Sequence, residues 1–211
     1  SAYIKDIINH LNALNYTRWY DCSLLRSYDH WNDEYTDSWG RRTVSKAFVD
    51  FTIKACLLSQ EGYLNKDKLF ARCVDLVVTE KCSMKCKDCS NLMQYYLKPQ
   101  TYSLEKVLES IDFLFSSIDE VYEMRVIGGE PMMNKDIHLI VDRLVKEEKV
   151  KRIVIYTNAT IPLKEPQVPY FRSPKVLFLI TDYDELSRNI SRLVGQLQDG
   201  GIAFSHYPRD G

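Results

Sequence analysis

The chain has 211 residues, of which 45% are hydrophobic and 27% charged, a composition that is typical of a globular protein and excludes a disordered or fibrous one. Its 28 Lys and Arg against 29 Asp and Glu give a net charge of -1, so no overall field favours nucleic acid or an anionic membrane. No run approaches the roughly 18–20 apolar residues of a membrane helix and no signal peptide opens the chain, so we expect a cytoplasmic protein with no nucleic-acid or membrane partner.

Residues 1–70 differ in composition and in the spacing of apolar residues from the rest of the chain. They contain all three tryptophans and apolar residues at helical spacing, such as Val44, Ala47 and Phe48. This spacing predicts a mainly helical N-terminal region without a motif that assigns a role. Its aromatic stretch, residues 19–39, either lines a substrate entrance or packs in a helical cap, and packing is favoured.

From residue 71 onward, strands and helices are expected to alternate. Apolar runs predict five buried strands, at residues 74–78, 121–127, 152–157, 176–180 and 202–205. Ser103 and Asn134 are expected to cap the helices after the first two strands, and a helix over about 184–198 follows the fourth. Three prolines within residues 159–173 argue against an ordinary helix after the third strand. The predicted class is therefore α/β, with a parallel sheet.

Three of the six cysteines are crowded into the loop after the first predicted strand, Cys82-Ser-Met-Lys-Cys86-Lys-Asp-Cys89. Without a secretory signal, such crowding favours a metal over disulfides. A C-x3-C-x2-C loop can wrap around one corner of a cubane iron–sulfur cluster, and three thiolates leave one iron without a protein ligand. A structural zinc site is the alternative, but it needs a fourth ligand such as Cys73, a histidine or Asp88.

The second predicted strand ends in Gly128-Gly129-Glu130-Pro131. Two glycines let the backbone approach a ligand that a Cβ atom would block, and a carboxylate can accept a hydrogen bond from an ammonium group. The alternative is a plain strand-to-helix turn in which Glu130 faces solvent.

Polar residues also follow the third, fourth and fifth predicted strands. In parallel αβ barrels the active site collects at these carboxyl ends, whereas turn or capping chemistry is the alternative explanation for the same residue types. The pairs are Thr157-Asn158, Thr181-Asp182 and Ser205-His206.

The cysteine loop followed by Gly-Gly-Glu-Pro one βα unit later resembles the radical SAM superfamily, over about residues 70–211. The stretch from Val77 to Tyr96 further resembles a bacterial subgroup with mostly unassigned substrates. The resemblance implies a partial (βα) barrel that binds a 4Fe–4S cluster and S-adenosylmethionine. The implied cluster ligands are Cys82, Cys86 and Cys89, and the implied S-adenosylmethionine contacts are Gly128, Gly129, Glu130, Pro131, Asn158, Thr181, Asp182 and Ser205.

The resemblance also implies an activity. The reduced cluster cleaves S-adenosylmethionine, and the 5′-deoxyadenosyl radical takes a hydrogen from a small-molecule or peptide substrate, with a one-electron reductant such as flavodoxin or ferredoxin. Two features depart from the family: Asp88 stands where an aromatic residue is common, and the chain stops after five predicted strands. We therefore expect residues 71–211 to be a C-terminally incomplete core. A zinc or inert iron–sulfur binding module and an inactive fragment are the alternatives.

Overall fold

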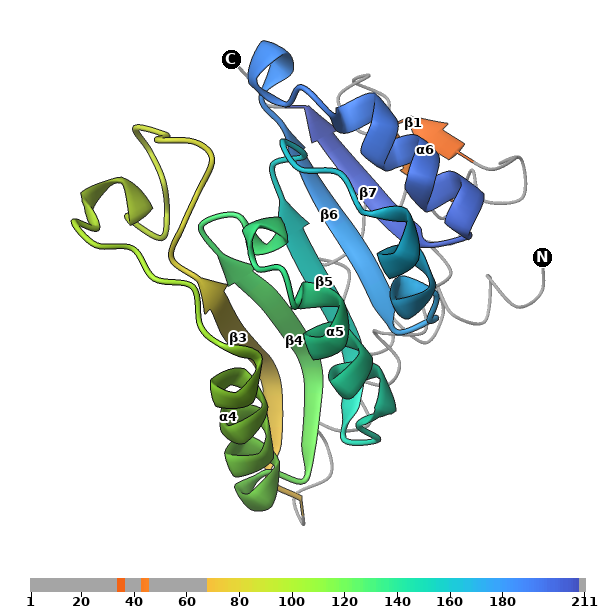
Figure 1. The fold of residues 1–211 in the computed structure, drawn as a ribbon. Coiled ribbons are helices and arrows are strands. Elements are labelled where there is room, and N and C mark those ends of the chain that lie inside the picture. Colours follow the sequence, from red (N-terminus) through yellow and green to blue (C-terminus); the bar gives the residue numbers. More distant parts are fainter. Residues whose placement is uncertain (1–33, 37–42, 46–67, 209–211) are drawn as a thin grey trace, which may run out of the picture.

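The computed structural model describes residues 34–36, 43–45 and 68–208, which form one seven-stranded sheet in the order β1-β2-β7-β6-β5-β4-β3 (Figure 1). Five neighbouring strands run parallel to one another. They are β3 (Phe70–Thr79), β4 (Glu120–Gly128), β5 (Val150–Thr157), β6 (Val176–Asp182) and β7 (Ala203–Pro208). The expected α/β class with five parallel strands is confirmed.

Within the part of the chain that the structure describes, three α-helices cover one face of this sheet (Figure 1). Four short 3₁₀ helices lie in the connections between strands and helices over residues 68–208. The α-helices are α4 (Leu104–Ser117), α5 (Ile137–Lys146) and α6 (Ile190–Gly200), and the 3₁₀ helices are η3 (Met93–Tyr95), η4 (Pro131–Met133), η5 (Glu165–Phe171) and η6 (Asp184–Leu186). Among the described residues, the α-helices lie on this face alone, and the other face forms the inner wall of a partial barrel.

The core lies between the helices and the sheet. Met124, Ile153 and Phe178 from three strands are fully buried there beside Ile111 and Ile140 from two helices. Burying each such side chain contributes roughly 1.5–3 kcal/mol. Because successive side chains of a strand point to opposite faces, the alternate residues of the same strands face the inner wall and are free to be polar.

The two predicted helix caps have different outcomes. Ser103 is confirmed as the N-cap of α4, where its hydroxyl accepts a bond from the Lys106 N–H at 3.4 Å. Asn134 does not cap α5, because the residue before that helix is Asp136. The buried Asn134 amide instead donates to the carbonyls of Val78 (2.9 Å) and Tyr102 (3.2 Å), which satisfies two acceptors near the end of β3.

The connections before and after β6 agree in part with those predicted from the sequence. Residues 159–173 contain no α-helix and only the 3₁₀ helix η5, as the prolines predicted. The helix expected over about 184–198 is shorter at its start, since residues 184–186 form the 3₁₀ turn η6 and α6 begins at Ile190. Asp184 lies at a positive φ of 52°, which is incompatible with an α-helix.

The described part of the N-terminal region is a β-hairpin. Strands β1 (Glu34–Thr36) and β2 (Thr43–Ser45) pair antiparallel, and β2 pairs with the edge of β7 through Val44 and Ser205. The prediction that Val44 lies in a helix is therefore wrong, since the open edge of β7 offers hydrogen bonds to an extended, β-branched segment. The other helices expected within residues 1–70 lie outside the described residues. Within residues 68–208 and the hairpin, no helix is long and apolar enough to cross a bilayer.

Candidate functional site

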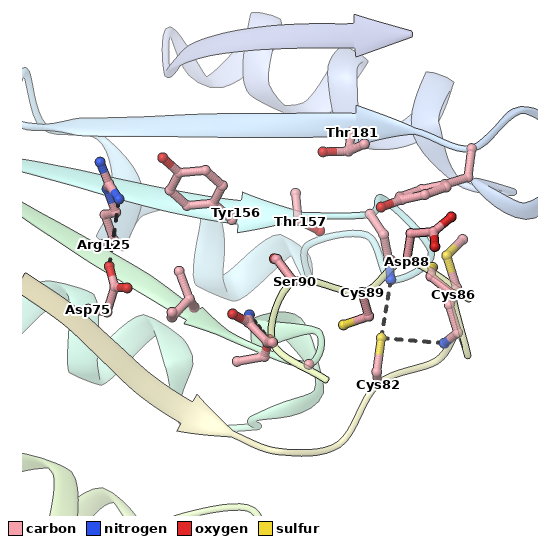
Figure 2. A pocket seen from close by; sticks show the side chains of 17 residues that line it. Asp75, Cys82, Cys86, Asp88, Cys89, Ser90, Arg125, Tyr156, Thr157 and Thr181 are labelled. Carbon is pink, nitrogen blue, oxygen red and sulfur yellow. Dashed lines mark hydrogen bonds and ion pairs between the residues drawn. The ribbon is translucent and has the colours of Figure 1, made fainter. Parts of the chain in front are cut away.

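A cavity of about 350 Å³ opens at the carboxyl ends of β3, β4, β5 and β6, between the cysteine loop and the inner face of the sheet (Figure 2). This volume falls within the range of small-molecule and cofactor sites. Seven of the eleven residues predicted for the site line it. They are Cys82, Cys86, Cys89, Gly128, Gly129, Asn158 and Thr181.

The three cysteines of the loop gather at one end of this cavity (Figure 2), are half-buried and form no disulfide. The Cys82 Sγ atom lies 3.4 Å from the Met84 N–H donor and 3.7 Å from Asn158 Nδ2. Burial raises the pKa of Cys82, the hydrogen bond from the Met84 N–H opposes that rise, and the nearby Glu130 carboxylate adds to it. All three cysteines line the same cavity.

The thiols are not yet in ligating positions. Within the described parts of the chain, no three His, Cys, Asp or Glu side chains converge closely enough to hold a metal ion. Of the proposed fourth zinc ligands, Cys73 does not line the cavity and instead lies 3.9 Å from Glu123 Oε1, whereas Asp88 lines it beside the three cysteines.

The two glycines at the end of β4 allow the start of the cysteine loop to pack against them. A Cβ atom on Gly128, whose φ is 152°, would lie 2.0 Å from the Thr79 carbonyl oxygen, and one on Gly129 would lie 2.2 Å from that of Lys81. The backbones are joined here, since Gly129 N–H donates to Thr79 (2.9 Å) and Glu130 N–H donates to Lys81 (2.8 Å). The structure thus adds a reason for the glycines that the sequence did not predict: close approach of the chain's own backbone.

The Glu130 carboxylate is completely buried, so the alternative of a solvent-facing turn residue is wrong. Its Oε1 accepts bonds from the Met132 N–H (3.1 Å) and the Thr157 hydroxyl (2.8 Å), while Oε2 accepts from the Asn158 N–H (2.8 Å). Burial raises the pKa of Glu130 to about 7, and these three donors oppose that rise. Glu130 therefore ties the turn after β4 to the end of β5. Neither Glu130 nor the buried Pro131 lines the cavity, and their contact with S-adenosylmethionine stays a prediction.

Asn158 joins the cysteine loop to the ends of β5 and β6. Its Nδ2 donates to Ser83 Oγ (3.2 Å), and its Oδ1 accepts from both the backbone N–H (3.1 Å) and the hydroxyl (2.7 Å) of Thr160. Its own carbonyl accepts a bond from Ser187 Oγ at 2.8 Å. Because Asn158 also lines the cavity, any ligand there would contact a side chain that is already held in place.

The predicted site residues at the ends of β6 and β7 differ in whether they line the cavity. Thr181 lines the cavity, whereas Asp182 does not and bonds instead to His206 Nε2 (3.0 Å) and the Asp184 N–H (2.8 Å). Ser205 is fully buried away from the cavity, and its hydroxyl has no hydrogen-bond partner within the described part of the chain. A role for Asp182 or Ser205 in binding the nucleoside stays a prediction without support from the cavity.

A polar group that was not predicted from the sequence lies at the other end of the cavity, formed by Asp75, Arg125 and Tyr156 on three neighbouring strands (Figure 2). Arg125 Nε lies 2.7 Å from Glu123 Oε1, and its Nη1 lies 4.0 Å from Asp75 Oδ1. A signal existed in the alternation of these polar residues with apolar ones along each strand. Asn91 was also missed as a site residue, although its amide donates to the Gly128 carbonyl at 3.0 Å.

Comparison with known proteins decides the family, since the model of the radical SAM superfamily matches residues 76–192. The chain belongs to the radical SAM superfamily. It is 31% identical over 114 residues to a GTP 3′,8-cyclase of Ectopseudomonas mendocina, covering 54% of this chain and 33% of that protein. It is 30% identical over 91 residues to a GTP 3′,8-cyclase of Aquifex aeolicus, covering 42% and 28%. The chain thus spans about a third of the length of these curated relatives.

A solved structure of tagged anSMEcpe with bound AdoMet is 16% identical to the chain, with a TM-score of 0.48 over 64% of this chain and 41% of that one. The predicted family is confirmed by the superfamily match. Radical SAM proteins are enzymes that use a 4Fe–4S cluster and S-adenosylmethionine, so this cofactor pair is confirmed as well and zinc is not favoured.

Proposed function

We propose that this chain is the catalytic core of a radical SAM enzyme, with a 4Fe–4S cluster on Cys82, Cys86 and Cys89. The bound, reduced cluster would supply one electron that splits S-adenosylmethionine into methionine and a 5′-deoxyadenosyl radical, which takes a hydrogen atom from the substrate. One observation carries the proposal: all three cysteines share a single cavity with Gly129 and Asn158, from the two strand ends that follow.

The residues of the chain have separable tasks in this proposal. The three thiolates would bind three irons and leave the fourth for S-adenosylmethionine. Gly129 and Glu130 hold the start of the cysteine loop and the end of β5 in fixed positions through the bonds described above. Thr181 lies where a nucleoside could reach, while Arg125 and Tyr156 offer polar groups at the far end of the cavity.

The substrate and the electron donor belong to the proposal too. We infer a small-molecule or peptide substrate and a carrier of the flavodoxin or ferredoxin type. The GTP in the names of the cyclases is not carried over, because the match covers about a third of their length and substrate contacts come from variable loops. The division into residues 1–70 and a core over 71–211, the cytoplasmic location and the absence of nucleic-acid partners stay predictions.

Anaerobic reconstitution with iron and sulfide tests the proposal. The chain is reduced with dithionite in the presence of S-adenosylmethionine, and 5′-deoxyadenosine is measured by chromatography beside a Cys86→Ala variant. We expect the product only with the unaltered cysteine motif. A cluster that forms without any product would favour an inert iron–sulfur protein, and stoichiometric zinc with no cluster would restore the zinc alternative.

A further inference from the structure

The connection from β3 to α4 carries basic and apolar side chains on one exposed loop, which projects from the sheet beside β3 (Figure 1). Leu92, Tyr95 and Leu97 are 56%, 72% and 97% exposed. Several exposed apolar side chains within one short connection are a candidate interaction surface. We name the lysine–tyrosine surface after its members, which are Lys85, Lys87, Leu92, Tyr95, Leu97 and Lys98.

This surface is positively charged although the chain as a whole is not. Between positions 81 and 98 the sequence has four lysines against the single acid Asp88, a local charge of +3 compared with -1 for the whole chain. Lys85, Lys87 and Lys98 are exposed and form no ion pair with any other described residue. Such a patch attracts an acidic partner and raises its rate of encounter.

The surface is joined to the cysteine loop by hydrogen bonds. Gln94 Nε2 donates to the Lys87 carbonyl at 3.2 Å, and the Leu92 N–H donates to the Cys89 carbonyl at 3.0 Å. Lys85 and Lys87 stand between the cysteines themselves. A protein bound to this surface would therefore contact the same loop that carries the cysteines.

We propose that the lysine–tyrosine surface docks an acidic one-electron carrier protein of the flavodoxin class, an inference that rests on the proposed function. One electron leaves the reduced carrier and enters the cluster on the three cysteines, so the carrier is oxidised by one electron and no atom is transferred. The lysines steer the carrier, and Tyr95 and Leu97 bury apolar area in the small interface typical of transient redox encounters. Lysines interleaved with the cysteines favour this partner over an anionic membrane or nucleic acid.

The first experiment compares two reductants on the reconstituted chain. A variant with Lys85→Glu, Lys87→Glu and Lys98→Glu is matched by a control with Lys68→Glu, Lys164→Glu and Arg192→Glu, which are exposed on other elements. With flavodoxin at low salt, we expect 5′-deoxyadenosine formation to fall roughly tenfold or more in the first variant only. With dithionite, which needs no docking, both variants should stay within about twofold of the parent. The flavodoxin difference should shrink as salt is raised, because salt screens exposed charges.

A second experiment does not depend on catalysis. Titration of fluorescently labelled flavodoxin with the reconstituted chain measures docking directly, and a Tyr95→Ser, Leu97→Ser variant should weaken it at both low and high salt. An equal loss with flavodoxin and dithionite, or unchanged flavodoxin affinity in both variants, would overturn the proposal. Preferential binding of anionic vesicles or single-stranded DNA over flavodoxin would also overturn it. If dithionite yields no 5′-deoxyadenosine while flavodoxin still docks, the proposed function fails and the docking surface stands.

Discussion

Replacing Glu130 by glutamine tests whether its carboxylate stabilises the fold by joining the turn after β4 to the end of β5. The Glu130→Gln side chain keeps its volume, and its oxygen can still accept from Met132 and Thr157. Its NH₂ group, however, would face the Asn158 N–H donor that now lies 2.8 Å from Oε2. A buried donor left without an acceptor costs about 1–3 kcal/mol. The opposite orientation of the amide would leave two donors unsatisfied and cost more.

We therefore expect Glu130→Gln to lower the free energy of unfolding by about 2 kcal/mol, or the melting temperature by about 4–8 °C for a domain of this size. Urea unfolding at pH 7.5 without cluster or S-adenosylmethionine measures this loss, because only bonds within the chain contribute. Glu109→Gln on the exposed side of α4 is the matched control and should stay within about 0.5 kcal/mol. Equal stability of both variants would refute the fastening role and leave Glu130 to act only on a ligand.

The remaining predictions concern pH, the glycines and Asn158. Since burial raises the pKa of Glu130 to about 7 from 4.5, the stability from its bound proton is present below pH 4.5 and lost as pH rises through 7. Urea unfolding between pH 5 and 7.5 should thus show the parent losing about 1–3 kcal/mol more than Glu130→Gln. Gly129→Ala should cost about 1–3 kcal/mol by overpacking, whereas Gly195→Ala, with nothing within 4 Å, should gain about 0.5–1 kcal/mol in thermal unfolding. Asn158→Ala should release iron to a chelator faster than the parent, and equal release would show that its bond to Ser83 does not hold the loop.

The parallel strands could be predicted because their apolar runs and the polar residues after them are local patterns. The side chains that face the cavity could not be predicted at every strand end. Thr181 and Asp182 are adjacent in β6 and must point to opposite sides of the sheet. The one that lines the cavity is Thr181, while Asp182 bonds to His206 on β7. A shift of one residue in register would have exchanged them, and register depends on pairing with distant strands.

Partners far apart in the sequence also explain two wrong predictions. Asn134 follows the pattern of a helix cap, but its side-chain amide donates a hydrogen bond to the Val78 carbonyl, 56 residues away. Val44 follows a helical spacing, but β2 completes the edge of β7, more than 150 residues later in the chain. In both places local propensity competes with hydrogen bonds to backbone groups whose position only the fold determines. Leaving such a backbone group without a partner costs more free energy than overriding the local propensity, so the long-range hydrogen bond forms.

The Gly-Gly-Glu-Pro segment shows the same limit at the site itself. Its order after the cysteine loop was enough to predict that the two belong together, and both glycines do line the cavity. The contacts of Gly128, Gly129 and Glu130 within the chain, however, are with Thr79, Lys81 and the end of β5. Each of these contacts holds the cysteine loop or its neighbouring strand end. Substitutions in the segment should therefore impair loop geometry before any ligand is added, which separates their effect from that of a residue that only touches S-adenosylmethionine.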